Sequence, residues 1–505
     1  MSQFYQTLKT TAEKRATHDA IIEGETRWTY SQFLQQVDQA TLAFQTQGIT
    51  PGERVGLMLF NQKEFLVCFF ALRKMGAIVV PINIQMLPQD IAYVIQNAGM
   101  RQLVIADSFY PLLKQMPLNF IVVGETQEGG LSYEQFLNTA EGAAQEVAQD
   151  PDQLAFLIYT SGTTGYPKGV MLSENNVTSN MAGFREVIHF YETDRMVLAL
   201  PLFHAYGLVV SLTCLMVGGA ITLVPKFHPK KIVEALVSEK ATILPLVPTL
   251  FTVILDLISK TGAVDHELRF SVSGGAALPA PLLEKIEAVF HAPVIEGYGL
   301  TETAPVLAVN DPEIGSIPSC VGKPLPNVQI KIVSKDNTDC VTGEVGEVLA
   351  KGPNIMLGYY NLPEETQAAM TPDGWFRTGD LGHLDAEGRL YISGGRKKDL
   401  IIKAGENISP VPIETVLYAM EGIREAAVIG LPHEKLGEEI VACVALHEGQ
   451  ALSPQDIIRH CRALLAPAHL PGEVIILEEL PKNPGGKVVK KLLREQLTHR
   501  EGVTH

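Results

Sequence analysis

Short runs of apolar residues recur along about the first 300 residues of the chain, separated by amphipathic stretches. The runs have the length of β-strands, and several of the stretches between them have the apolar spacing of helices. Predicted strands include RVGLML (54–59), QLVIA (102–106), LAFLIY (154–159) and PVIEGYG (293–299), and predicted helices include PKKIVEALVSEK (229–240) and PAPLLEKIEAVF (279–290). Strands that alternate with helices form parallel, largely buried sheets. The pattern therefore predicts an α/β fold.

The pattern changes twice further along the chain. From about residue 325, short strands separated by turn residues predict a small antiparallel barrel, and after about residue 398 a compact α+β pattern begins. The basic, glycine-rich SGGRKKD (393–399) is the best boundary between them. We therefore predict a large N-terminal domain of stacked α/β sheets plus the small barrel (residues 1–397) and a small α+β C-terminal domain (residues 398–505).

Composition and charge narrow the class of protein. The chain has 505 residues, of which 46% are hydrophobic and 19% charged, as in ordinary globular proteins with large cores. Its net charge of -16 argues against a nucleic-acid partner, because binding phosphates needs clustered basic residues. Six scattered cysteines indicate neither a zinc site nor a disulfide framework. The polar N-terminus has no signal-peptide core, so we expect a cytoplasmic location.

One stretch tests the expectation that the chain has no integral membrane segment. LFHAYGLVVSLTCLMVGGAITLV (202–224) has no charged side chain and is long enough to span a bilayer. It also contains a histidine, three glycines and several hydroxyl residues. We expect a buried helix followed by a strand; a helix that contacts a membrane surface, which would make the protein peripheral to a membrane, stays an alternative.

A loop rich in glycine and hydroxyl residues follows one predicted strand. YTSGTTGYPKG (159–169) can turn backbone N–H groups and hydroxyls toward a phosphate, with Lys168 as a point charge. It is not a Walker motif, because Pro167 precedes the lysine and Gly169 follows it where a Ser or Thr would hold magnesium. A surface turn is the alternative interpretation.

Further motifs follow this loop in order. They are LPLFHAYG (200–207), SVSGGAAL (271–278), EGYGLTETAP (296–305), GWFRTGDLGHLD (374–385), GRKKDLIIKAGEN (395–407) and LPKNPGGKVVKK (480–491). The Tyr298 ring offers a face for stacking, Thr301 a hydroxyl and Glu302 a carboxylate for Mg²⁺. A strand-to-helix turn with an N-capping threonine is compatible with the same residues. Together the motifs resemble the adenylate-forming superfamily, and most closely its bacterial AMP-forming fatty acyl-CoA synthetases.

The resemblance implies roles for individual residues. Catalytic roles fall on His204, Thr301, Glu302 and Lys487, with Glu302 as the Mg²⁺ ligand; a core histidine with satisfied hydrogen bonds is the alternative for His204. Nucleotide-binding roles fall on Thr160, Ser161, Gly162, Thr163, Thr164, Gly165, Lys168, Gly274, Gly275, Ala276, Tyr298, Gly299, Asp380 and Arg396. Lys398 corresponds to a hinge, and Gly405, Glu406 and Asn407 to a loop on the coenzyme A side. Many relatives have Gly-Gly where this chain has Ala404-Gly405.

The same resemblance implies a reaction with ATP, Mg²⁺ and coenzyme A. A carboxylic acid attacks the α-phosphorus of ATP, pyrophosphate leaves, and the acyl-adenylate is then transferred to a thiol with release of AMP. In the family the C-terminal domain is mobile and rotates between the two steps, which removes the counterpart of Lys487 from the site. Whether the protein forms a homodimer stays open.

The identity of the substrate acid and of the acceptor thiol is predicted less specifically than the reaction. The stretch beside His204 is apolar and has no carboxylate for an amino group, which favours a medium- or long-chain fatty acid over an amino acid; an aryl-CoA ligase is an alternative. The compact run GEVLAKGPNIMLGYYN (346–361) lacks the insertion typical of fatty acyl-AMP ligases. This favours coenzyme A over an acyl carrier protein, which stays an alternative partner. A luciferase-like oxidase and an inactive acyl- or nucleotide-binding homologue are further alternatives.

Overall fold

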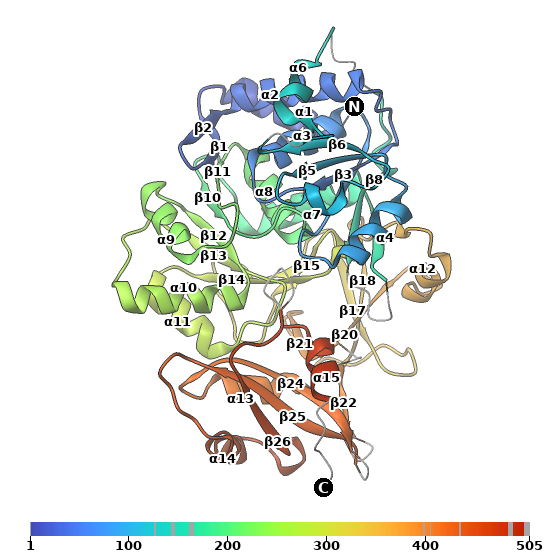
Figure 1. The fold of residues 1–505 in the computed structure, drawn as a ribbon. Helices are drawn as coiled ribbons and strands as arrows, with labels where there is room; N and C mark the ends of the chain where they lie inside the picture. Colours follow the sequence, from blue (N-terminus) through green and yellow to red (C-terminus); the bar gives the residue numbers. More distant parts are fainter. Residues whose placement is uncertain are drawn as a thin grey trace.

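The computed structural model describes residues 2–125, 128–142, 147–160, 166–396, 399–403, 406–433, 436–482 and 488–498, with backbone only at 394–396, 406 and 407. Two large sheets dominate the first 360 residues (Figure 1). One has the order β16 (Lys323–Pro324), β15 (Val306–Val309), β14 (Val294–Gly299), β13 (Phe270–Ser273), β12 (Ile243–Leu246), β10 (Arg195–Leu198), β11 (Ala220–Leu223), β1 (Asp19–Glu23) and β2 (Thr26–Thr29). Its central strands run parallel, whereas β2, β15 and β16 are antiparallel to their neighbours.

The second large sheet carries the strand that precedes the glycine-rich loop. Its order is β19 (Gly358–Tyr359), β9 (Lys168–Ser173), β8 (Leu154–Thr160), β4 (Ile78–Pro81), β3 (Arg54–Met58), β5 (Gln102–Ala106), β6 (Asn119–Val123) and β7 (Leu131–Ser132). Strands β3 to β8 pair in parallel, and β9 and β19 are antiparallel additions. All four apolar runs cited above form strands, so the predicted α/β fold class is confirmed.

Helices connect the strands and fill the space around the sheets. They are α1 (Gln3–Lys14), α2 (Tyr30–Thr46), α3 (Lys63–Lys74), α4 (Pro88–Ala98), α5 (Tyr110–Leu113), α6 (Tyr133–Asn138), α7 (Glu174–Ile188), α8 (Ala205–Val217), α9 (Pro229–Ser238), α10 (Pro248–Thr261), α11 (Ala280–Phe290) and the short 3₁₀ helix η1 (Thr301–Thr303). The largest buried cluster draws residues from both sheets and from α1, α2, α3, α7 and α8. Helix α7 contacts β8 and β9 of one sheet and β15 of the other, and thus joins the two.

The uncharged stretch at 202–224 folds as predicted into a buried helix, α8, and a strand, β11. The Ser and Thr hydroxyls of α8 bond to its own backbone: Ser211 donates to the Leu208 carbonyl at 2.7 Å and Thr213 to the Val209 carbonyl at 2.8 Å. Gly218 ends the helix with a φ of 100°. In the described parts of the chain, no helix has both the length and the apolar character that a membrane crossing requires.

The later part of the chain forms two smaller sheets. The order β17 (Gln329–Val333), β18 (Gly346–Lys351), β20 (Phe376–Leu384) and β21 (Leu390–Arg396) is antiparallel as predicted, and α12 (Pro363–Ala369) precedes β20. The four strands pair in one path, and Cys320 pairs with Tyr391 on the other side of β21. Closure of this sheet into the predicted barrel stays a prediction.

The last sheet lies in the C-terminal part and matches the predicted α+β pattern. Its strands are β23 (Glu406–Ile408), β22 (Ile401–Lys403), β25 (Gly437–Leu446), β24 (Ile423–His433) and β26 (Glu473–Leu477), with α13 (Pro410–Tyr418), α14 (Pro454–Leu464), the 3₁₀ helix η3 (Pro467–His469) and α15 (Lys490–Thr498). Figure 1 shows this sheet and its helices grouped apart from the two large sheets. The predicted domain boundary at 397/398 falls on residues outside the description and stays a prediction.

Candidate active site

The predicted phosphate loop connects β8 to β9 at one end of their antiparallel pair. Thr160, the last residue of β8, lies opposite Lys168, the first residue of β9. Strand β8 is buried apart from its two end residues, as its apolar sequence predicts. The loop residues Ser161, Gly162, Thr163, Thr164 and Gly165 lie outside the described residues. The structure thus places the two ends of the loop, and the phosphate-binding role of its centre stays a prediction.

Tyr359 connects two of the predicted site residues. Its hydroxyl donates a hydrogen bond of 2.9 Å to Oε1 of Glu302, and the Nζ atom of Lys168 lies 5.3 Å from the centre of its ring. The same ammonium group pairs with the carboxylate of Glu365, on α12. Neither Tyr359 nor Glu365 was assigned a role from the sequence, although Tyr359 belongs to the GYYN run used there to judge the length of this region.

The turn that carries Thr301 and Glu302 is held by other side chains. Thr303 is buried; its Oγ1 accepts the Leu300 N–H at 3.0 Å, and its carbonyl accepts the side-chain amides of Asn354 at 2.8 Å and Asn180 at 3.3 Å. The N-cap of this turn is Leu300, so neither threonine is the N-capping residue, and Thr303 bonds back to the Leu300 N–H. Thr301 is left to border the adjacent cavity, as its predicted catalytic role requires.

Two predicted nucleotide-binding residues meet directly. The Tyr298 hydroxyl donates to Oδ2 of Asp380 at 2.7 Å, although the two residues are 82 positions apart. Asp380 is only 6% exposed, and it lies opposite Arg396 in the pairing of β20 with β21. The contact brings the EGYG and TGD motifs together, which neither motif could show alone.

The glycines of these motifs allow close backbone approaches. A Cβ atom on Gly299 would lie 1.7 Å from the carbonyl oxygen of Pro305. Gly275 has a φ of +79°, a left-handed conformation that favours glycine. Gly274 packs against a tyrosine, because its Cβ would lie 3.3 Å from Cε1 of Tyr206. Gly274 and Gly275 line the cavity described next, while Gly275 and Ala276 line a second one.

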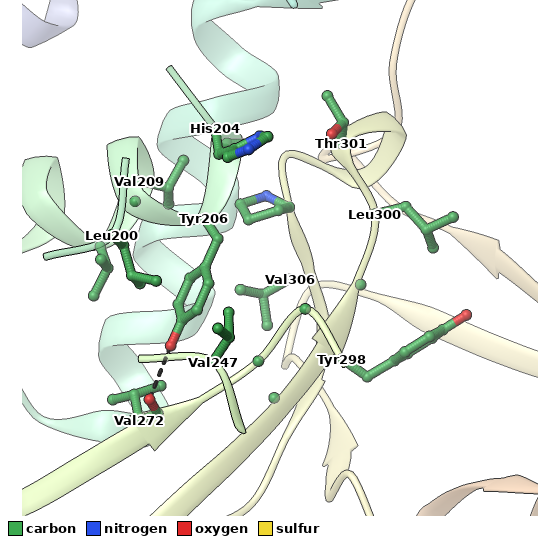
Figure 2. A pocket seen from close by; sticks show the side chains of 18 of the residues that line it. Leu200, His204, Tyr206, Val209, Val247, Val272, Tyr298, Leu300, Thr301 and Val306 are labelled. Atoms are coloured by element: carbon green, nitrogen blue, oxygen red, sulfur yellow. Dashed lines mark hydrogen bonds between the residues drawn. The ribbon is translucent and has the colours of Figure 1, made fainter. Parts of the chain in front are cut away.

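An apolar cavity of about 190 Å³ lies beside Thr301 (Figure 2). Its apolar lining consists of Phe184, Leu200, Pro201, Ala205, Val209, Val210, Val247, Val272, Leu300, Pro305 and Val306. The Tyr206 ring stands along one side, and its hydroxyl donates to the Val272 carbonyl at 3.0 Å. None of the described lining residues is Asp, Glu, Lys or Arg. Burial raises the pKa of Tyr206, so its hydroxyl stays neutral.

His204 stands at the edge of this cavity that is nearest Thr301 (Figure 2). It precedes the first residue of α8 and makes no capping hydrogen bond. Its Nε2 is shielded from solvent and has no hydrogen-bond partner within the described residues. Burial lowers the pKa of the ring to about 4, so the imidazole is neutral at pH 7. A core histidine with satisfied hydrogen bonds, the alternative left open above, does not fit this arrangement.

A second cavity, of about 260 Å³, extends from Tyr298 and Asp380 to the C-terminal part of the chain. Its lining there includes Glu414 of α13 and Lys490 of α15, whose side chains pair at 2.6 Å. Glu296 also lines this cavity and was not singled out from the sequence, although it begins the EGYG motif. Burial raises the pKa of Glu296 to about 8. The Leu278 N–H donates a hydrogen bond of 3.0 Å to its carboxyl group, which acts in the opposite direction and lowers the pKa.

The remaining predicted residues are not brought into the site by the described structure. Lys487, Lys398 and Gly405 lie outside the described residues, and Glu406 and Asn407 appear only as backbone of β23. Their roles stay predictions.

The donor set suits a metal ion that binds together with its nucleotide. Within the described ranges, no three His, Cys, Asp or Glu side chains gather into a metal site. Mg²⁺ is usually held by one or two carboxylates plus substrate phosphates, and does not need a cage built from protein alone. The single carboxylate of Glu302, beside the ends of the phosphate loop, fits that mode of binding.

Comparison with known proteins identifies the family. Residues 7–360 match the AMP-binding enzyme family and residues 412–487 match the AMP-binding enzyme C-terminal domain. The chain belongs to the AMP-binding enzyme family. It is 33% identical to a long-chain-fatty-acid–CoA ligase from Mycobacterium tuberculosis over 94% of this chain and 95% of that protein. It is 34% identical to a sulfoacetate–CoA ligase from Cupriavidus necator over 90% of each chain.

Solved structures give the same result. The crystal structure of ATP-bound MatB from Rhodopseudomonas palustris superposes with a TM-score of 0.88 at 30% identity, over 99% of each chain. The predicted membership of the adenylate-forming superfamily, with acyl-CoA synthetases among the relatives, is therefore confirmed. Adenylate-forming CoA ligases use ATP, Mg²⁺ and coenzyme A, the cofactors predicted from the sequence. Because the relatives differ in their acids, membership alone does not name the acid for this chain.

Proposed function

We propose that the protein is an AMP-forming ligase that activates a carboxylic acid with an uncharged, apolar tail and transfers the acyl group to coenzyme A. The observation that carries this proposal is the uncharged cavity of about 190 Å³, with Thr301 and the neutral His204 at its border. An acid whose tail filled this cavity would hold its carboxylate beside those two polar groups, next to the nucleotide-binding motifs.

The first step brings two negatively charged groups together. A carboxylate oxygen forms a bond to the α-phosphorus while the bond to the β-phosphate breaks and pyrophosphate leaves. Catalysis of such a step consists mainly of positioning and of stabilising charge. Thr301 would donate to a phosphate oxygen, Glu302 would hold Mg²⁺, and Tyr298 with Asp380 would bind the nucleoside. When bound, Mg²⁺ supplies positive charge to the phosphates.

The absence of charge in the cavity selects against acids with a second ionised group. Burying an unpaired carboxylate or sulfonate is costly, and no described lining residue offers a positive partner. The relative named for sulfoacetate therefore need not share its acid with this chain, despite an identity of 34%.

The volume of the cavity supports the medium-chain part of the prediction more than the long-chain part. A cavity of roughly 150 Å³ in another protein holds benzene. At about 190 Å³, this one accommodates a ring or a medium aliphatic chain. An aryl acid stays an alternative, since its volume also fits.

The acceptor thiol is proposed to be that of coenzyme A. Strands β18 and β19 lie within residues 346–361, the compact run without an insertion that favours coenzyme A over a carrier protein. In the second step the sulfur bonds to the acyl carbon and AMP leaves. We propose that the C-terminal domain, residues 398–505, rotates about Lys398 before this step and withdraws Lys487.

Release of pyrophosphate across a panel of acids tests the proposal. The panel contains hexanoate, octanoate, palmitate, benzoate, malonate and sulfoacetate, each with and without coenzyme A. We expect the highest kcat/KM with hexanoate, octanoate or benzoate, and release with malonate or sulfoacetate near background. A preference for malonate or sulfoacetate would contradict the assignment of the cavity. Adenylate that a phosphopantetheinylated carrier protein consumes, and coenzyme A does not, would identify the carrier protein as acceptor.

A further inference from the structure

We propose that Tyr359 is a positioning residue of the nucleotide site, whose hydroxyl orients Glu302 for the metal ion that accompanies ATP. The inference rests on the proposed function, because the assignment of Glu302 as a metal ligand belongs to it. Tyr359 itself touches Glu302 and need not touch ATP.

The backbone holds Tyr359 firmly in place. It pairs with Val170 in the antiparallel contact of β19 with β9, and its N–H donates to Oγ1 of Thr366 at 2.8 Å. The N–H of the next residue, Tyr360, donates to the carbonyl of Gly169 at 2.8 Å. Because β9 begins with Lys168, these contacts fix the position of Tyr359 relative to that lysine at the end of the phosphate loop.

The hydroxyl of Tyr359 holds one oxygen of the Glu302 carboxylate. The hydrogen bond to Oε1 is 2.9 Å long, while the backbone carbonyl of Glu302 accepts the Met356 N–H at 2.9 Å. Backbone and side chain of Glu302 are thus anchored to the same segment, 356–359. With Oε1 engaged, Oε2 is the oxygen that a cation would take. Such outer partners fix the orientation of a metal ligand and raise metal affinity.

The ring of Tyr359 also contacts the lysine of the phosphate loop. Nζ of Lys168 lies 5.3 Å from the ring centre, within the range of a cation–π interaction. The two contacts place Tyr359 between the ammonium group and the carboxylate of Glu302. The ring of Tyr359 contacts Lys168 and its hydroxyl contacts Glu302. Replacing this Tyr with Phe keeps the ring and removes only the hydrogen bond to Glu302.

The test compares Tyr359→Phe with the matched variant Tyr360→Phe. Each loses one phenolic hydroxyl, and the backbone hydrogen bonds of both positions are kept. Binding of Mn²⁺, a substitute for Mg²⁺, is followed by electron paramagnetic resonance in the presence of α,β-methylene-ATP, which cannot release pyrophosphate. We expect Tyr359→Phe to weaken Mn²⁺ binding about 10-fold, the lower end of the loss seen when an outer partner of a metal ligand is removed. Tyr360→Phe should bind Mn²⁺ like the wild type.

Two further measurements separate the possible outcomes. Pyrophosphate release by Tyr359→Phe should need about 10-fold more Mg²⁺ and recover at saturating Mg²⁺, whereas a variant damaged in its fold would not recover. Wild-type Mn²⁺ binding by Tyr359→Phe would overturn the inference. Glu302→Gln tests the underlying assignment: if it loses Mn²⁺ binding while Tyr359→Phe does not, only the role of Tyr359 is wrong. If Glu302→Gln also binds Mn²⁺ like the wild type, the metal assignment in the proposed function is wrong too.

Discussion

The two cavities of the site differ in the charged and polar groups that line them. The apolar cavity of about 190 Å³, proposed to hold the substrate acid, is called the acid cavity here. In it, the Nε2 atom of His204 and the hydroxyl of Ser273 are buried with no hydrogen-bond partner among the described residues. In the cavity that reaches the C-terminal part, Tyr298 is bonded to Asp380 and Lys490 to Glu414. The first cavity is thus suited to select its ligand by volume and lack of charge, and the second by hydrogen bonds and charges.

A histidine in the first cavity and a carboxyl group in the second are buried and neutral at pH 7. Burial lowers the pKa of His204 to about 4 in the acid cavity and raises that of Glu296 to about 8 in the other. The cause is the same, since burial disfavours the charged form of both groups. The directions differ because imidazole gains charge with a proton and a carboxyl group loses it. Low pH therefore charges His204 in the acid cavity, and high pH charges Glu296 in the other cavity.

Removing the carboxylate that Tyr298 contacts should have the largest effect. Asp380→Ala should raise the Kd for ATP about 10- to 100-fold, because hydrogen bonds to a charged group contribute roughly 1.5–3 kcal/mol. Calorimetric titration with ATP measures the change. Asp373→Ala, which removes an exposed carboxylate shortly before β20, is the matched control and should bind ATP like the wild type. Equal losses in the two variants would mean that the second cavity does not recognise ATP through Asp380.

Enlarging the acid cavity should change the choice of acid without changing ATP binding. Tyr206→Ala removes the ring along its side, and the ratio of kcat/KM for palmitate to that for hexanoate should rise. Each additional buried methylene contributes about 0.8 kcal/mol, or roughly fourfold. Tyr206→Phe keeps the ring and should leave the ratio unchanged. A ratio that stays constant in Tyr206→Ala would show that the cavity does not contact the acyl chain.

Replacing Glu296 should make the protein more resistant to alkali. The folded-state pKa of about 8 lies above the ordinary value of 4.5, so the unfolded chain ionises first and the free energy of unfolding falls as the pH rises from 4.5 to 8. Glu296→Gln keeps an oxygen to accept the Leu278 N–H and lacks this titration. Its stability relative to the wild type should therefore increase between pH 5.5 and pH 8.5 in denaturant unfolding. A constant difference would refute the burial of a neutral carboxyl group.

Replacing His204 should have the smallest effect, a change in stability at low pH. Its folded-state pKa of about 4 lies below the ordinary value of 6.5, so the free energy of unfolding falls as the pH drops from 6.5 to 4. His204→Gln lacks this titration, and its melting temperature relative to the wild type should rise between pH 7 and pH 5. If the difference stays the same at both pH values, the imidazole is not held neutral by the cavity.

The sequence predicted the strands better than the contacts between distant motifs. Apolar runs such as 154–159 became buried strands, since a continuous apolar run has no polar face to expose to solvent. The bond between Tyr298 and Asp380 joins residues far apart in the chain, and no local pattern contains it. Tyr359 and Glu296 were missed for the same reason, although both stand inside motifs that were recognised. The antiparallel strands after residue 325 were predicted too, but strand patterns do not show whether such a sheet closes into a barrel.

The central claim is that the protein forms an acyl-adenylate from an acid with an uncharged tail. The most direct measurement incubates the enzyme with ATP, Mg²⁺ and octanoate, quenches the mixture, and detects octanoyl-AMP by mass spectrometry. The proposed function predicts octanoyl-AMP with pyrophosphate in equal amount, and conversion to octanoyl-CoA and AMP when coenzyme A is added. Absence of octanoyl-AMP and of pyrophosphate, with benzoate and hexanoate equally inactive, would contradict it.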